Sequence, residues 1–119
     1  DAGGTYSLPR LVGQARATAM SMLGDKIPAE DAAQWGLIWK VVDDETLAGE
    51  ARAVAERLAA GPTKAFGLMK RAFDASARND LSAQLDLERD LQTIAGRTED
   101  HREGVAAFRE KRKAAFKGR

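Results

Sequence analysis

The sequence has 119 residues, of which 44% are hydrophobic and 31% charged, and this balance predicts one small folded domain rather than a disordered chain. Lysine and arginine total 19 against 18 aspartates and glutamates, so no global charge favours nucleic acid or a membrane surface. The lack of cysteine excludes disulfides and thiol chemistry. No apolar run approaches the roughly 18 residues of a membrane span, and we expect a soluble, cytoplasmic protein without nucleic-acid or membrane partners.

The first residues place a carboxylate, Asp1, just before a small residue and two glycines, Gly3 and Gly4. Glycine lets a backbone approach a ligand closely because no side chain crowds it. Asp1 is therefore a candidate acid of a binding or catalytic site, although it could equally cap the glycine turn. Since a loop at the rim of a site needs elements that hold it, we expect the chain to be the carboxyl-terminal part of a longer protein.

Helix signals follow this turn. We expect a short turn or helix over 3–11, a helix over 15–23 that ends in a left-handed Gly24, and another helix that starts at Pro28 and closes at Trp35. The next segment, 37–42, is short, β-branched and aromatic, which predicts one strand. A single strand cannot make a sheet, so it would have to pair outside this sequence or lie at an edge.

From Asp44 onward, apolar residues recur at three- and four-residue spacings, and this pattern predicts four amphipathic helices. Thr63, either Asn79 or Asp80, and Thr98 are the expected amino-terminal caps of the last three. Such helices should pack on each other or on a partner chain. The third is apolar over a wide arc. We favour its burial within this domain over a subunit interface, which would leave a large apolar surface on an isolated monomer.

The tail over 109–119 holds six basic residues and one acid, a local charge of +5. The usual role of such a tail is a solvated helix end whose cations complement the helix dipole. The alternative is a site for a phosphate-bearing ligand, because lysine, arginine and a nearby phenylalanine suit both a phosphate and a stacked base. The single histidine, His101, has no second histidine or cysteine beside it, and we expect a surface residue with no metal and no catalytic role.

Four stretches in register carry a family resemblance: DAGGTY at 1–6, LPRLVG at 8–13, AEDAAQWGLI at 29–38 and GVAAFREKR at 104–112. Together they resemble the carboxyl-terminal half of the enoyl-CoA hydratase/isomerase (crotonase) family. The resemblance implies a mostly α portion of an α/β, ClpP/crotonase-like spiral fold, with one short strand. Residues 1–43 would end the core of that fold, and residues 44–119 would form a helical trimerisation region.

The resemblance also implies chemistry. Asp1 would be the general acid/base that moves a proton while the thioester oxygen is held as an enolate, with Gly3 and Gly4 in the active-site turn. The oxyanion donors would lie outside this chain, so the chain alone should be inactive. Coenzyme A is part of the substrate, and no separate cofactor or metal is expected. Aspartate at position 1, together with the stretches over 35–44 and 84–90, resembles the branch that isomerises ring-epoxide phenylacetyl-CoA.

For partners, the resemblance implies a homotrimer or a hexamer made of two trimers. Phe108 and Lys111 would reach the coenzyme A of the neighbouring subunit, with the phenylalanine on adenine and the lysine on phosphate. Two alternatives stay open. One is an enoyl-CoA hydratase of fatty-acid oxidation, and the other is a helical assembly module without chemistry of its own.

Overall fold

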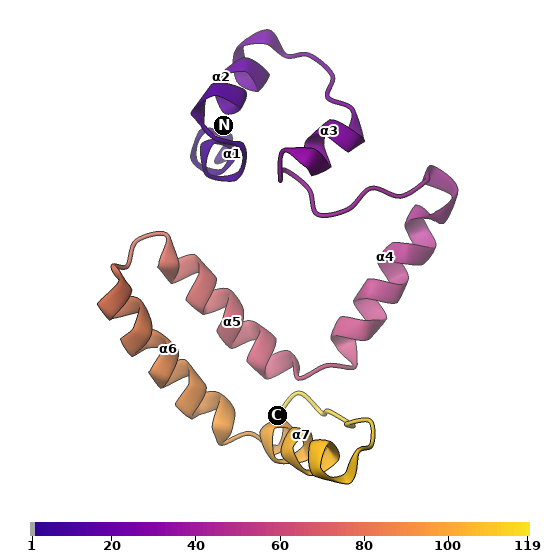
Figure 1. Ribbon diagram of the computed structural model, residues 1–119, viewed down its shortest axis with the longest axis vertical. Helices are drawn as coiled ribbons and strands as arrows, with labels where there is room; N and C mark the ends of the chain where they lie inside the picture. The colour runs from indigo at the N-terminus through magenta and orange to yellow at the C-terminus, as the bar shows by residue number, and fades with distance from the viewer. Residues whose placement is uncertain (1) are drawn as a thin grey trace. The chain divides into compact units, whose positions relative to one another are not determined.

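The computed structural model describes residues 2–119, so Asp1 lies outside the described residues. Within that range the regular secondary structure is helical, which confirms the mostly α prediction (Figure 1). The chain divides into two compact units, with the boundary between Ala48 and Gly49. The helices are α1 (Gly4–Val12), α2 (Gln14–Leu23), α3 (Ala29–Gln34), α4 (Asp44–Ala59), α5 (Thr63–Ser76), α6 (Leu81–Gly96) and α7 (Glu99–Glu110).

In the first unit, α1 and α2 pack on each other across a break at Gly13, where Val12 and Ala17 are buried. The carboxyl end of α2 is the predicted left-handed glycine, since Gly24 has φ 67° and its amide donates to the Met20 carbonyl over 3.3 Å. Ala32 of α3 is the third buried apolar residue of this unit. The helix positions expected over 3–11, over 15–23 and from Pro28 are therefore confirmed.

The strand predicted over 37–42 is wrong, because this segment is irregular in the structure. The amides of Leu37 and Ile38 both donate to the Ala32 carbonyl, over 2.9 and 3.3 Å, and so close the end of α3. The Trp39 side chain is 77% exposed. Residues with a high β-propensity are those that pack well on a pleated, half-buried sheet surface. Residues 2–119 contain no strand that could provide such a surface.

In the second unit, α5 and α6 lie side by side in opposite directions (Figure 1), and Leu68 and Leu91 are their buried residues. The side chains of Asp80 and Thr98 cap α6 and α7 as predicted, accepting from the amides of Ala83 and His101. Thr63 does not cap α5. Pro62 precedes the helix, and Thr63 is already its first helical residue, so its hydroxyl is not at the capping position.

Burial corrects the packing expected for α6 and shows that α4 is not covered. No residue of α4 is buried, and the helix pairs that pack most closely are α1 with α2 and α5 with α6. On α6, Leu91 is buried but Leu81 and Leu85 are 74% and 56% exposed, so most of the wide apolar arc is not covered within this unit. Among residues 2–119, no helix is long and apolar enough to cross a membrane.

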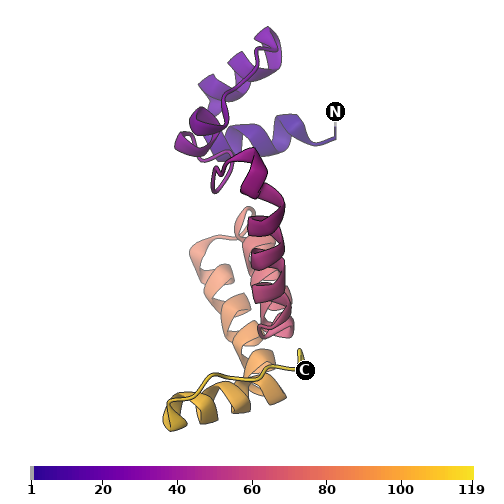
Figure 2. The same cartoon turned by 90° about the vertical axis from the view of Figure 1, so that its right-hand side faces the viewer.

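The carboxyl-terminal tail leaves α7 at Lys111 and runs back beside that helix without secondary structure of its own (Figure 2). Its last residues reach the beginning of α7, where the Asp100 amide donates to the Arg119 carbonyl over 3.1 Å. The tail and α7 therefore form one layer at the end of the second unit.

Candidate functional site

The predicted site residues fall into two separate groups, one in each unit. In the first unit, Asp1 lies outside the described residues, but the turn that follows it is described. Ala2 has φ 48° and Gly3 has φ 82°, so two successive residues are left-handed before α1 begins at Gly4. The Gly3 carbonyl accepts from the amides of Tyr6 and Ser7, over 3.0 and 2.9 Å. A left-handed alanine costs about 1–2 kcal/mol, and such strain concentrates at functional turns.

The exposed side of α1 carries an ordered pair of side chains. The Arg10 guanidinium lies 3.6 Å from the centroid of the Tyr6 ring, and its Nη1 donates to the Tyr6 carbonyl over 2.7 Å. Tyr6 is half exposed. The helix that follows the glycine turn therefore has its first aromatic side chain held in place by a residue one turn later.

In the second unit, the structure brings Phe108 and Lys111 together at the carboxyl end of α7. Lys111 is left-handed, with φ 53° and ψ 37°, and its amide donates to the Phe108 carbonyl over 3.3 Å. The Arg112 amide donates to the Ala107 carbonyl over 3.0 Å, which completes a Schellman motif. Glycine usually occupies this position, so a lysine there is a backbone outlier.

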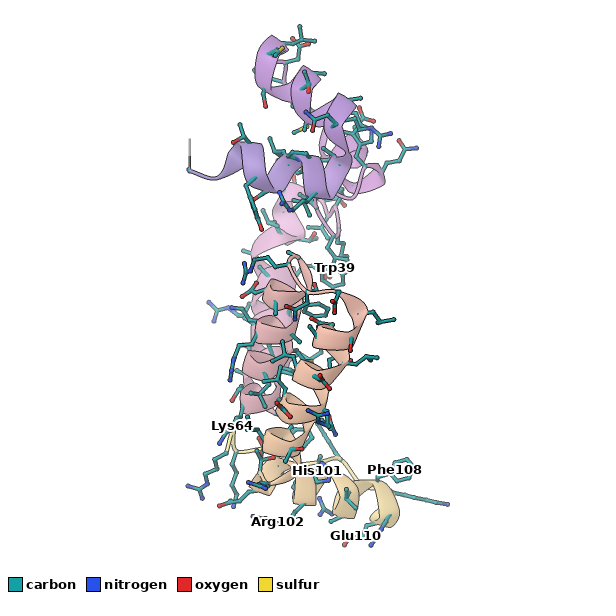
Figure 3. The ribbon with its side chains drawn as sticks, turned by 90° about the vertical axis from the view of Figure 1, so that its left-hand side faces the viewer. Trp39, Lys64, His101, Arg102, Phe108 and Glu110 are labelled. Carbon is teal, nitrogen blue, oxygen red and sulfur yellow. The ribbon has the colours of Figure 1, made fainter. Side chains whose placement is uncertain are left out.

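The Phe108 side chain is 85% exposed and points outward from α7 (Figure 3). It borders an open groove of about 490 Å³ between α5, α6 and α7. The groove is mainly apolar. His101 is exposed and is one of the residues that line it. Its apolar lining includes Pro62, Ala65, Ala95, Val105, Phe108 and Phe116. An exposed aromatic ring beside a lysine can stack on a base while the ammonium group meets a phosphate.

Two carboxylates of α7 hold the tail, and sequence reasoning missed both. Asp100, only 4% exposed, accepts from the amides of Lys117 and Gly118 over 2.6 and 2.8 Å. Glu103, one turn later on the same face, accepts from the Ala115 amide over 2.8 Å. Acids three residues apart, followed by a strongly basic tail, were the signal available in the sequence.

Arg112 is exposed, as expected for a solvated basic tail, but it is also paired with two carboxylates. Its Nη1 and Nη2 lie 2.6 and 3.0 Å from the two oxygens of Glu103, and its Nε lies 2.6 Å from Glu110 Oε2. The hydrogen bond from Arg112, with that from the Ala115 amide, lowers the pKa of Glu103 to about 2. Among residues 2–119, no group of three or more histidine, cysteine, aspartate or glutamate side chains is placed to hold a metal ion.

Comparison with known proteins identifies the family. A family model described as enoyl-CoA hydratase/isomerase matches residues 1–119. The chain is 52% identical over its whole length to the 1,2-epoxyphenylacetyl-CoA isomerase of Escherichia coli K12 and covers 45% of that protein. It is also 52% identical over its whole length to a Rhodobacter capsulatus protein named "Probable enoyl-CoA hydratase", of which it covers 46%.

A solved structure supports the same family. A crystal structure of an enoyl-CoA hydratase/isomerase family protein from Mycobacterium abscessus superposes with a TM-score of 0.95 at 44% identity, over 100% of this chain and 46% of that one. The chain belongs to the enoyl-CoA hydratase/isomerase family, and its helices are a portion of the crotonase fold. It spans about half the length of the curated relatives that it matches.

Proposed function

We propose that this chain is the carboxyl-terminal part of an acyl-CoA isomerase that acts on ring-epoxide phenylacetyl-CoA or on an enoyl-CoA double bond. The observation that carries the proposal is the 52% identity, over the entire chain, with a 1,2-epoxyphenylacetyl-CoA isomerase. Since the chain covers 45% of that relative, the full-length enzyme is the unit of activity in this proposal, and the chain alone is inactive.

In this proposal Asp1 is the general acid/base. The α-carbon of an acyl-CoA thioester is weakly acidic, and its proton leaves when the thioester oxygen is stabilised as an enolate. A carboxylate next to the acyl chain can then carry that proton to another carbon, or give it to the ring oxygen as a C–O bond opens. The left-handed Ala2 and Gly3 support this role, because they form a strained turn directly after the acid.

Lys111 and Phe108 contact the nucleotide end of coenzyme A in the neighbouring subunit. Phe108 is 85% exposed and Lys111 follows it at the same helix end, so both are available to a molecule outside the unit. Oligomerisation through this region is supported by the exposed apolar side chains of Phe73, Leu81 and Leu85, which a neighbouring subunit would bury. A homotrimer or hexamer is the proposed assembly.

A hydratase is the second candidate, because the Rhodobacter capsulatus relative named as an enoyl-CoA hydratase matches with the same 52% identity. Hydration of an enoyl-CoA requires a second carboxylate that positions water, and this residue would lie outside the chain. In that case Asp1 would shape the acyl pocket without transferring the proton. The weakest candidate is a helical assembly module without chemistry of its own, because assembly alone does not require an acid at a glycine turn.

The test compares the full-length enzyme with its Asp1→Asn variant on ring-epoxide phenylacetyl-CoA and on a straight-chain enoyl-CoA. If Asp1 is the general acid/base, the variant loses about 100-fold or more of kcat in isomerisation with an intact fold. If the wild type hydrates the enoyl-CoA and the variant keeps that rate, the hydratase candidate replaces the isomerase. If the variant keeps full isomerase activity, Asp1 is not the general acid/base and only caps the turn.

A further inference from the structure

The carboxyl end of α7 has an unfavourable backbone conformation, and contacts with the tail hold it in place. Lys111 has φ 53°, which is a left-handed backbone conformation. For a residue other than glycine this conformation costs about 1–2 kcal/mol. Without a restraint, the chain after Glu110 would have other conformations open to it, and the ammonium group would sample many positions. Residues that hold the backbone on the far side of Lys111 therefore decide where that side chain is presented.

The residue directly after Lys111 is the one that is held. Arg112 makes a two-pronged contact with Glu103, at 2.6 and 3.0 Å, and its Nε lies 2.6 Å from Glu110. Guanidinium and carboxylate groups paired in this way fix orientation as well as distance. The Glu103 side chain is 24% exposed, whereas the carboxylates of Asp86, Asp90, Glu110 and Glu99, which also pair with arginines, are 48–68% exposed. Glu103 thus ties the turn back to the body of α7.

The tail beyond Arg112 is anchored by a second set of contacts. Ala115 donates to Glu103, and Lys117 and Gly118 donate to the buried Asp100. Gly118 has φ 75°, and a Cβ there would lie 2.5 Å from Thr63 Oγ1, so the tail passes closely over the start of α5. Both ends of the segment after Lys111 are therefore fixed to the helix that carries Phe108.

We propose that Glu103, through Arg112, is a positioning residue that presents Lys111 and Phe108 to the nucleotide end of coenzyme A. This inference rests on the proposed function, in which those two residues contact coenzyme A. Glu103 does not touch the substrate itself. It fixes the turn so that the ammonium group and the exposed ring keep one spacing and one direction.

The test uses the full-length enzyme and one acyl group carried on two thioesters, coenzyme A and pantetheine, which lacks the nucleotide. In Glu103→Gln, KM for the coenzyme A thioester should rise about 10-fold with kcat little changed, because only binding of the nucleotide is weakened. The pantetheine thioester should react as in the wild type. The matched control is Asp86→Asn, which breaks an exposed pair with Arg89 on α6 and should change neither substrate.

Two outcomes overturn the positioning role: an equal loss on both thioesters, which means general damage to the fold, and no change on either. Lys111→Gly separates this idea from the proposed function, because glycine tolerates φ 53° but has no ammonium group to contact a phosphate. If KM for the coenzyme A thioester rises in Lys111→Gly but not in Glu103→Gln, only the positioning role fails. If it rises in neither, the contact with coenzyme A fails, and the positioning role falls with it.

Should Glu103→Gln not fold, Arg112→Lys takes its place in the same assay. Lysine keeps the charge opposite Glu103 but cannot make the two-pronged contact, so a smaller rise in KM for the coenzyme A thioester alone is expected. An unchanged KM in this variant counts against the positioning role.

Discussion

Arg112 and Glu103 face each other across the turn that ends α7, with Nη1 2.6 Å from Oε1 and Nη2 3.0 Å from Oε2. This relationship joins the basic tail to the helix that carries Phe108. It also means that part of the positive charge near the end of the sequence is already neutralised within the unit. Lys111, at the turn itself, is exposed and remains available to an outside ligand.

The first prediction concerns pH. The pKa of Glu103 falls from 4.5 to about 2, chiefly through the Arg112 hydrogen bond, so the folded state binds fewer protons than the unfolded chain in this range. Its stabilisation is therefore complete above pH 4.5 and is lost as the pH falls toward 2. Melting curves of the wild type and Glu103→Gln should show a Tm gap that shrinks over this range. A gap independent of pH would contradict the assignment.

The second prediction concerns the cap of α7. Thr98 is 8% exposed, and its hydroxyl accepts from the His101 amide over 3.0 Å and donates to the Ala95 carbonyl over 2.7 Å. Thr98→Ala should cost about 0.5–2 kcal/mol because an amide at the helix start loses its partner. Thr93→Ala is the control, since its exposed hydroxyl donates to the Arg89 carbonyl and lies away from the start of α6. Denaturant unfolding that ranks the two variants equally would refute the cap's importance.

The third prediction concerns the close approach of the tail to α5. Gly118→Ala should lower the stability by about 1–2 kcal/mol, because alanine is disfavoured at φ 75° and its Cβ would meet Thr63. Gly67→Ala is the matched control, since Gly67 lies inside α5 with open space around it. That change should stabilise the protein by about 0.5–1 kcal/mol. Thermal melts in which both variants move Tm in the same direction would contradict this account.

The fourth prediction is a trade between stability and binding at Lys111. Lys111→Gly removes the cost of a left-handed lysine, so the variant should be at least as stable as the wild type, by up to about 1 kcal/mol. The same variant should bind coenzyme A thioesters more weakly if the proposed contact exists. Melting temperature and KM measured on one preparation check both parts, and a loss of stability would show that the lysine side chain supports the fold.

Several features could be predicted from the sequence because they depend on neighbours in the chain. Gly24 ends α2, and Asp80 and Thr98 cap α6 and α7, since a left-handed glycine and a capping oxygen act within one helical turn. The family was also recognisable, because four motifs stand in register along the chain. Local chemistry and motif spacing were enough for these conclusions.

Other features were decided by contacts distant in sequence. The segment over 37–42 has a strand-like composition, yet the amides of Leu37 and Ile38 end α3, because strand formation needs a pairing edge that residues 2–119 do not supply. Burial on α6 separates Leu91 from Leu81 and Leu85, which share its apolar arc but lie outside the packed face. The pairing of Glu103 with Arg112, nine residues apart, arises only when the tail reverses direction.

The sequence by itself therefore determined the helices, the caps of α6 and α7 and the family, because these follow from interactions within a turn and from ordered motifs. Only the tertiary structure decided that the tail folds back on α7 and that Asp100 and Glu103 hold it. Basic residues are equally compatible with a solvated tail and with a paired one until the positions of the acids are known. The difference lies in burial, since Asp100 is 4% exposed and binds backbone amides that no sequence pattern marks.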